Sequence, residues 1–207
     1  MTDKPTKKPK FDLDLHTYRL LQAEPFFSAL SRRINKSQTQ SIPTAGVMLN
    51  EGSGTFEMIY NPEFFEKLTD KQKLGVLKHE FYHIIFEHVT GRLPPEGMSK
   101  LWNVATDLAI NSFLMDELPE GGCIPTRGIF ESYPKEQSAE WYYSKLQQDQ
   151  ENQEGAYDPQ HGGQGGDGDG DGQGQGDPDS MDDHSGWSKA DADTKQMAKE
   201  RMRQAVE

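Results

Sequence analysis

The 207-residue sequence contains a single cysteine, Cys123, which excludes an intrachain disulfide framework. It has no apolar run long enough to cross a bilayer, and its basic first ten residues lack the apolar core of a signal peptide. Basic residues are also fewer than acidic ones, with 22 Lys and Arg compared with 34 Asp and Glu. A chain without a basic surface is a poor partner for phosphates. We therefore expect a soluble, cytoplasmic protein that binds neither nucleic acid nor membranes.

The negative charge is concentrated in one segment that is rich in Gly, Gln and Asp. Eleven Asp and Glu lie between residues 149 and 183, and no Lys or Arg lies between Lys145 and Lys189. A segment with so little to bury does not offset its ordering entropy. We therefore expect the chain to divide into four parts: a flexible basic tail (1–10), a folded domain (11–148), a disordered acidic linker (149–180) and a C-terminal segment with a helical tail (181–207).

Apolar spacing along the folded domain predicts a mainly helical α+β fold with a small β-sheet. Two strands, 44–50 and 55–60, flank the turn-forming sequence Glu-Gly-Ser-Gly and form a hairpin. Thr69 and Gln72 form a capping box that opens the best-defined helix. Helical spacing is found, with a break at Pro25 in the first range, over residues 11–36, 62–65, 69–91, 99–114 and 138–148.

The helix that opens at Thr69 carries the sequence His79-Glu80-Phe-Tyr-His83, which matches the pattern H-E-x-x-H. Residues four apart lie on nearly the same face of a helix, so both imidazoles can reach one metal ion. The intervening carboxylate can accept a proton from a water that the metal activates. The pattern predicts a zinc site with His79 and His83 as ligands and Glu80 as general base. The alternative is a pair of surface histidines that bind no metal.

A catalytic zinc site needs a third protein ligand and one open position. Asp107 is our candidate, because a carboxylate at the centre of the apolar helix 99–114 is costly to bury without a partner. Asn111, one turn later, would orient Asp107. The alternative is that Asp107 is exposed on a polar face of its helix. His88 lies nine residues after His79, about 180° around the helix, so we expect it to be solvated unless the helix ends before it.

Three segments resemble a bacterial and phage family of putative metallopeptidase domains, often found ahead of a von Willebrand factor A-like domain. They are residues 77–83 (LKHEFYH), 102–111 (WNVATDLAIN) and 182–187 (DDHSGW). The resemblance covers about residues 13–187. It implies a zincin-like fold, in which the two strands belong to a small sheet beside the H-E-x-x-H helix, and it implies that Asp107 is the third ligand.

The predicted function is hydrolysis of peptide bonds in a peptide or protein substrate by a zinc metalloendopeptidase that uses Zn²⁺ and Glu80. The strand 55–60 or its neighbour would hold an extended substrate by edge pairing. Four residues are candidates for the hydrogen-bond donor that stabilises the transition state: Tyr82, Arg127, Tyr133 and His184.

His184 has two interpretations. The segment 182–187 is either a docking segment that folds back onto the site or a short anchor in which Trp187 packs and His184 is solvated; the second is favoured. For the whole chain, one alternative is a non-catalytic, zinc-stabilised module that recruits a partner protein through its acidic linker and tail. A metal-free helical interaction protein is another.

Overall fold

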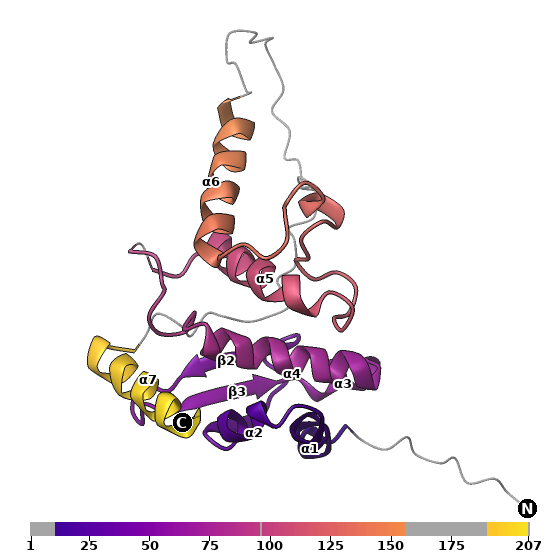
Figure 1. Ribbon diagram of the computed structural model, residues 1–207, viewed down its shortest axis with the longest axis vertical. Helices are drawn as coiled ribbons and strands as arrows, with labels where there is room; N and C mark the ends of the chain where they lie inside the picture. The colour runs from indigo at the N-terminus through magenta and orange to yellow at the C-terminus, as the bar shows by residue number, and fades with distance from the viewer. Residues whose placement is uncertain (1–10, 96, 156–189, 207) are drawn as a thin grey trace, which may run out of the picture.

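The computed structural model describes residues 11–95, 97–155 and 190–206 (Figure 1). The predicted basic tail, most of the predicted acidic linker, His184 and Trp187 lie outside these residues. The described residues form an α+β structure that has seven α-helices and one three-stranded sheet. In chain order the elements are α1 (Leu13–Ala23), α2 (Phe26–Ser31), β1 (Ile34–Gln38), β2 (Ala45–Leu49), β3 (Phe56–Tyr60), α3 (Pro62–Lys67), α4 (Asp70–Ile85), α5 (Lys100–Leu114), a 3₁₀ turn (Gly128–Phe130), α6 (Ala139–Gly155) and α7 (Ala192–Val206).

The sheet confirms the predicted hairpin and adds a strand that the sequence did not predict. β2 and β3 pair antiparallel, with Ala45 opposite Tyr60 and Leu49 opposite Phe56. β1 pairs parallel to β3, which gives the strand order β1-β3-β2. The predicted helix over residues 11–36 was therefore wrong at its end, because Ile34 begins a strand. Its apolar spacing fits a helix, but pairing with β3 decides its conformation.

The helix boundaries follow the capping residues. The Thr69–Gln72 capping box is present at the start of α4, and the Ser99 side chain accepts a hydrogen bond from the Trp102 amide at the start of α5. The predicted linker boundary at 149 was wrong, because α6 continues to Gly155. Asp149 accepts hydrogen bonds from Lys145 one turn earlier and from Tyr133, which ties this part of the helix to the domain.

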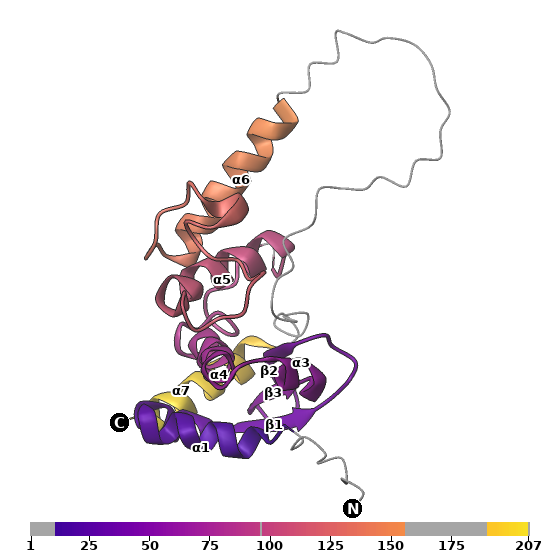
Figure 2. The same ribbon diagram turned by 90° about the vertical axis from the view of Figure 1, so that its right-hand side faces the viewer.

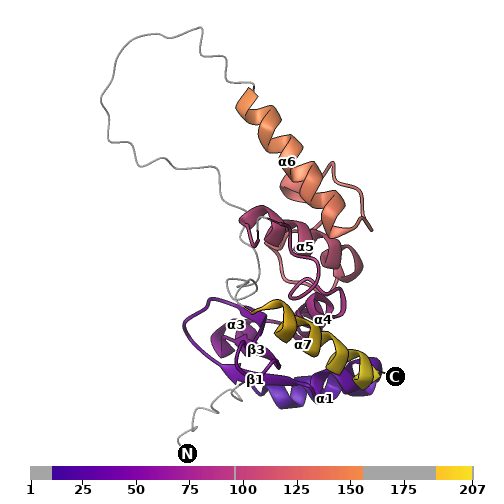
Figure 3. The ribbon, with the colours of Figure 1, turned by 90° about the vertical axis from the view of Figure 1, so that its left-hand side faces the viewer.

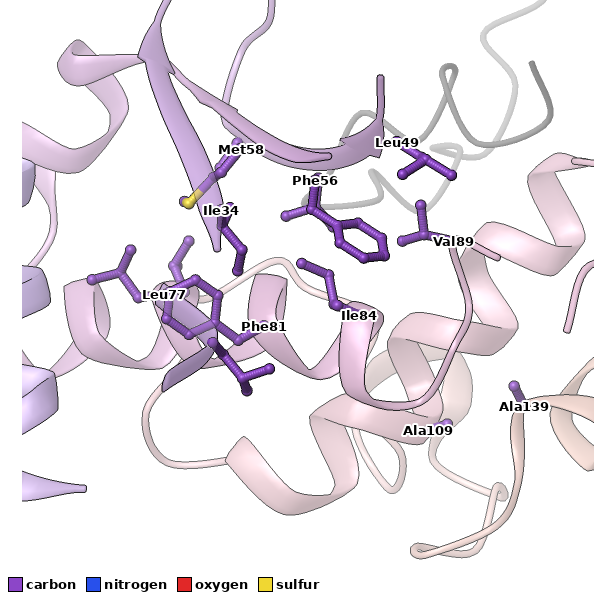
Figure 4. Close-up of a cluster of buried hydrophobic side chains, with 14 of the residues drawn as sticks. Ile34, Leu49, Phe56, Met58, Leu77, Phe81, Ile84, Val89, Ala109 and Ala139 are labelled. Atoms are coloured by element: carbon purple, nitrogen blue, oxygen red, sulfur yellow. The ribbon is translucent and has the colours of Figure 1, made fainter. Parts of the chain in front are cut away.

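The helix α4 lies between the sheet and α5, and α6 packs on α5 and extends away from the sheet (Figures 1 and 2). Apolar side chains from the inner face of the sheet meet those of α4 in the core (Figure 4). Phe81 at the centre of this contact is fully buried. Replacing such a side chain by Ala costs about 3–5 kcal/mol, so this core fixes α4 firmly against the sheet.

The C-terminal helix α7 packs on the same body, against α2 and the turn between β2 and β3 (Figure 3). Ala198 and Met202 of α7 belong to the main core cluster. The Arg201 guanidinium donates to the Ser53 carbonyl oxygen at 3.0 Å. The helical tail is therefore part of the folded domain. None of the helices in the described ranges has the length and apolar character needed to cross a membrane.

Candidate metal centre

The two histidines of α4 turn their rings toward the same point. His79 and His83 are each 0% exposed, so neither is a surface histidine. Their ring centroids are 4.6 Å apart, and their Nε2 atoms are 2.9 Å apart. The one-turn spacing of the motif thus places two nitrogen ligands of the type that zinc binds in a single buried position.

The third side chain comes from α5, the helix that packs on α4. Asp107 is also 0% exposed, so the alternative of a solvated acid is wrong. Its Oδ1 lies 3.6 Å from His79 Nε2 and 3.5 Å from His83 Nε2. His79, His83 and Asp107 therefore form a group that could hold a metal ion.

The separations among these atoms fit a small divalent cation. Metal–ligand bonds of about 2.0–2.2 Å at tetrahedral angles place the ligand atoms about 3.3–3.6 Å apart. The separations of 3.5 and 3.6 Å between Asp107 Oδ1 and the two Nε2 atoms lie in that range, and the 2.9 Å between the two Nε2 atoms is shorter. Only small movements of the side chains are needed to bind the ion.

The amide of Asn111 contacts His79 and not Asp107, which corrects our prediction. Its Nδ2 donates to the carbonyl oxygen of Cys123 at 2.8 Å, so its Oδ1 faces the His79 ring. His79 Nδ1 lies 2.7 Å from that Oδ1 and must carry the hydrogen. The lone pair of His79 is then on Nε2, which faces His83 and Asp107.

His88 is buried as well, so our expectation of a solvated side chain was wrong. It is 0% exposed, and its Nδ1 lies 3.2 Å from the Nδ1 of His83. α4 ends at Ile85. His88 therefore lies beyond the helix, and the expected angle of about 180° between His79 and His88 on a continuous helix does not apply. The sequence has no glycine or proline at residues 86–88 to mark this end, and the contact could not be found from the pattern.

Glu80 is held next to His79 on α4 and is also 0% exposed. His79, His83 and Asp107 thus lie in the interior where α4 and α5 meet, and Glu80 is a buried residue of α4. A peptide can reach them only if the residues around them move.

Two of the candidate transition-state donors form hydrogen bonds with other groups. The Tyr133 hydroxyl donates to Asp149 at 2.7 Å. Burial is the main cause of the raised pKa of Tyr133, and the contact with Asp149 raises it further. The Arg127 guanidinium donates to Met115 and Asp116 at the end of α5. Tyr82 packs between the rings of Phe27 and Phe86. The remaining candidate, His184, lies outside the described residues.

The sheet also decides which of the predicted strands offers an edge. Residues 55–60 include β3, which is the central strand and is paired on both sides. That half of our prediction was wrong, because a central strand has no backbone groups left for a substrate. Its neighbour β2 is one of the two edge strands of the described sheet and contacts α4.

Comparisons with known proteins give one relative and one family. A Thermotoga maritima protein, described only as "Uncharacterized protein", is 32% identical over 62 residues, which is 30% of this chain and 16% of that protein. No solved structure matches the chain. Residues 10–207 match the family described as "Putative metallopeptidase domain". The matched residues include α4, α5 and the C-terminal helix α7. The chain therefore belongs to the family of putative metallopeptidase domains.

Proposed function

We propose that the protein is a zinc-dependent peptidase with a zincin-like site, in which His79, His83 and Asp107 hold the metal ion. The observation that carries the proposal is the orientation of His79. Because Asn111 fixes the hydrogen on Nδ1, the His79 Nε2 lone pair points at the Asp107 carboxylate, 3.6 Å away, and at the His83 ring. A lone pair and a carboxylate that face each other in the interior repel unless a cation or proton lies between them.

The donor set supports zinc. Two imidazoles and one carboxylate, with a fourth position left for solvent or substrate, are the ligands of several catalytic zinc sites. The same donors also suit iron(II), and membership of a metallopeptidase family favours zinc. Elemental analysis of the purified protein distinguishes the two metals.

The chemistry is hydrolysis of a peptide bond. When bound, zinc supplies a Lewis acid that polarises the scissile carbonyl and acidifies a water molecule. Glu80 accepts a proton from the attacking water and then delivers it to the amine as the carbon–nitrogen bond breaks. The metal ligand His79 and the base Glu80 are consecutive residues of α4, so their backbones keep a fixed relation during the reaction.

The edge strand β2 is the place for the substrate backbone. An extended peptide can add to a sheet edge through main-chain hydrogen bonds, which bind any sequence in the same register. β2 contacts α4, the helix of the two histidines. The substrate is therefore a peptide or an unfolded protein segment.

A second function is favoured by the complete burial of the site. Structural zinc sites are closed to solvent, whereas catalytic sites keep one position open. His79, His83, Asp107 and Glu80 are all 0% exposed. The alternative is a metal-stabilised module that recruits a partner protein through the acidic linker and tail.

The test replaces Glu80 by Gln in the full chain, with Glu131→Gln, an exposed glutamate, as the matched control. Zinc content is measured by elemental analysis, folding by circular dichroism, and cleavage with a library of fluorogenic peptides. We expect about one zinc per chain in all three proteins and a loss of cleavage of about 10²–10⁴-fold in Glu80→Gln alone. Zinc binding without cleavage in the wild type favours the structural module. A natively folded protein without metal contradicts both functions.

A further inference from the structure

The C-terminal helix α7 forms one wall of a cavity at the place where it packs on the domain. This cavity of about 220 Å³ lies between α2, β3, the end of α4 and α7. Buried apolar side chains from all four elements line it: Leu30, Phe56, Ile84 and Met202. Phe56 and Ile84 point toward each other in Figure 4. The inner part of the cavity is therefore apolar.

The cavity opens at the surface beside an aromatic ring. Phe26 at the start of α2 lines it and is 54% exposed, which is unusual for a phenyl ring in a folded domain. Arg203 of α7 also lines it and is exposed. An apolar ligand that enters here removes from water both its own surface and part of the Phe26 ring, and both changes favour binding.

The charged groups that line the cavity are mostly basic. Lys199 and Arg203 are four residues apart on α7, so they lie on one face of that helix. Glu87, in the turn after α4, is the acidic residue that lines the cavity within the described ranges. Two cations and one carboxylate leave one positive charge at this place, in a chain whose net charge is -12. The local charge therefore favours an anion.

The turn after α4 holds the Lys199 ammonium group at the wall of the cavity. Lys199 Nζ lies 2.8 Å from Glu87 Oε2. A β-carbon on Gly91 would be 2.7 Å from that oxygen and 3.0 Å from Lys199 Nζ, so a glycine leaves the room that this pair occupies. An ammonium group has three donors and a guanidinium has five, so each can bind a further acceptor in addition to a partner within the protein.

We propose that the cavity binds a small amphipathic carboxylate, with its alkyl chain among the apolar side chains and its carboxylate beside Lys199 and Arg203. A water molecule takes about 30 Å³ in the liquid and a methylene group is of similar size, so the cavity holds about seven carbon atoms. Octanoate carries a chain of this length on its carboxylate. His79, His83 and Asp107 do not line the cavity, so the inference does not depend on the proposed function.

The experiment titrates the full chain with octanoate and with two ligands of the same shape, octanol and octylamine. Isothermal titration calorimetry gives the affinities, and ¹³C-methyl spectra of Ile84 and Met202 report where the ligand lies. Octanoate should bind about tenfold more tightly than either of the others, because its charge complements that of the cavity. Hexanoate should bind about 10–15-fold more weakly than octanoate, since it buries two methylene groups fewer.

Two variants locate the site. Ile85→Trp fills the cavity from a half-buried position in its lining and should weaken octanoate binding about tenfold or more. Arg203→Gln should weaken octanoate binding about two- to fivefold and leave octanol binding unchanged. Lys195→Gln is the matched control, because Lys195 is on the same helix and does not line the cavity. Circular dichroism establishes that each variant is folded.

Three results would overturn the proposal. The first is a folded wild type that does not bind octanoate at about 10 mM. The second is octanol binding as tight as that of octanoate, which would mean that the cavity accepts apolar groups without regard to charge. The third is octanoate binding that leaves the Ile84 and Met202 methyl signals unchanged, or that persists undiminished in a folded Ile85→Trp protein, because the ligand would then lie elsewhere.

Discussion

Gly75 of α4 lies directly against the backbone of Glu117, in the chain that follows α5. A β-carbon on Gly75 would be 2.2 Å from the Glu117 carbonyl oxygen and 2.7 Å from its carbonyl carbon. One turn further along α4, Lys78 pairs with Glu117 at 2.6 Å and with Glu24 at 2.9 Å. These contacts set the distance between α4 and the end of α5, and the candidate ligands lie on those two helices.

Gly75→Ala should therefore destabilise the protein although Ala is the better helix former. Helix propensity favours Ala by about 1 kcal/mol. The new β-carbon instead forces the backbone of Glu117 away, and overpacking of this kind costs about 1–3 kcal/mol or more. Urea denaturation should show a lower free energy of unfolding. Gly52→Ala is the control, because its β-carbon would meet only Asn50 Oδ1 at 3.5 Å. Equal stability of the two variants would contradict the close contact.

Much of the fold is predictable because its signals are local. The capping box at Thr69, the hairpin turn and the H-E-x-x-H spacing each depend on a few neighbouring residues, and each is present in the structure. The parallel strand β1 is not local, because its conformation depends on pairing with β3 about twenty residues later. The close approach at Gly75 is equally invisible, since a glycine within a helix gives no sign of the backbone that lies against it.

The candidate site shows the same division. Asp107 was found because a lone acid in an apolar helix needs a buried partner. The contacts of Asn111 with His79 and of His88 with His83 were missed because each depends on the tertiary structure. Asn111 is turned toward His79 by the Cys123 carbonyl oxygen, and His88 is turned toward His83 by the end of α4. Residue spacing on an ideal helix contains neither piece of information.

Zinc should stabilise the protein, and Asp107 should be required for this effect. A ligand that binds only the native state at 100 times its Kd adds about 2.7 kcal/mol to the free energy of unfolding. Asp107→Asn replaces a charged ligand by a neutral amide that zinc binds poorly. Differential scanning calorimetry with zinc and with a chelator should show a metal-dependent rise in Tm for the wild type and not for Asp107→Asn.

Asp116→Asn is the matched control for this measurement, because Asp116 is on the surface with its side chain 83% exposed. It should keep the zinc-dependent shift of the wild type. A shift of the same size in Asp107→Asn would mean that the carboxylate is not a ligand.

The ion pair between Arg92 and Glu140 should stabilise the protein at neutral pH and not in acid. Arg92 donates two hydrogen bonds to the carboxylate, at 2.8 and 2.5 Å. These bonds lower the pKa of Glu140. A lowered pKa contributes stability that is complete above the unfolded value, about 4.3, and is lost as the pH falls through the folded value. The Glu140 side chain is 54% exposed, so solvent screening limits the contribution to about 0.5–1 kcal/mol.

Arg92→Gln should thus lower the free energy of unfolding at pH 7, and the difference from the wild type should shrink as the pH falls below about 4.3 and vanish below the lowered pKa of Glu140 in the folded protein. Urea denaturation across this pH range measures both curves. Arg127→Gln, which removes a more exposed pair with Asp116, serves as the comparison. A difference that persists unchanged in acid would show that Arg92 acts through its bond to Phe86 and not through Glu140.

The backbone conformation of Glu87 and its side chain have opposite effects on the free energy of unfolding. Its φ of 58° strains a non-glycine residue by about 1 kcal/mol, and its carboxylate pairs with Lys199 at 2.8 Å. The side chains of this pair are 43% and 32% exposed, so the pair contributes about 0.2–1 kcal/mol.

Glu87→Gly loses the pair but relieves the strain, so its stability should equal or exceed that of the wild type. Glu87→Ala loses the pair and keeps the strain, so it should be less stable than the wild type and than Glu87→Gly. Lys199→Ala should resemble Glu87→Ala, because it also loses the pair and keeps the strain, whereas Lys195→Ala on the same helix should be neutral, because Lys195 forms no ion pair with the described residues. Thermal denaturation of the four variants gives the order. An alanine variant at Glu87 as stable as the glycine variant would mean that residue 87 relaxes out of the left-handed conformation.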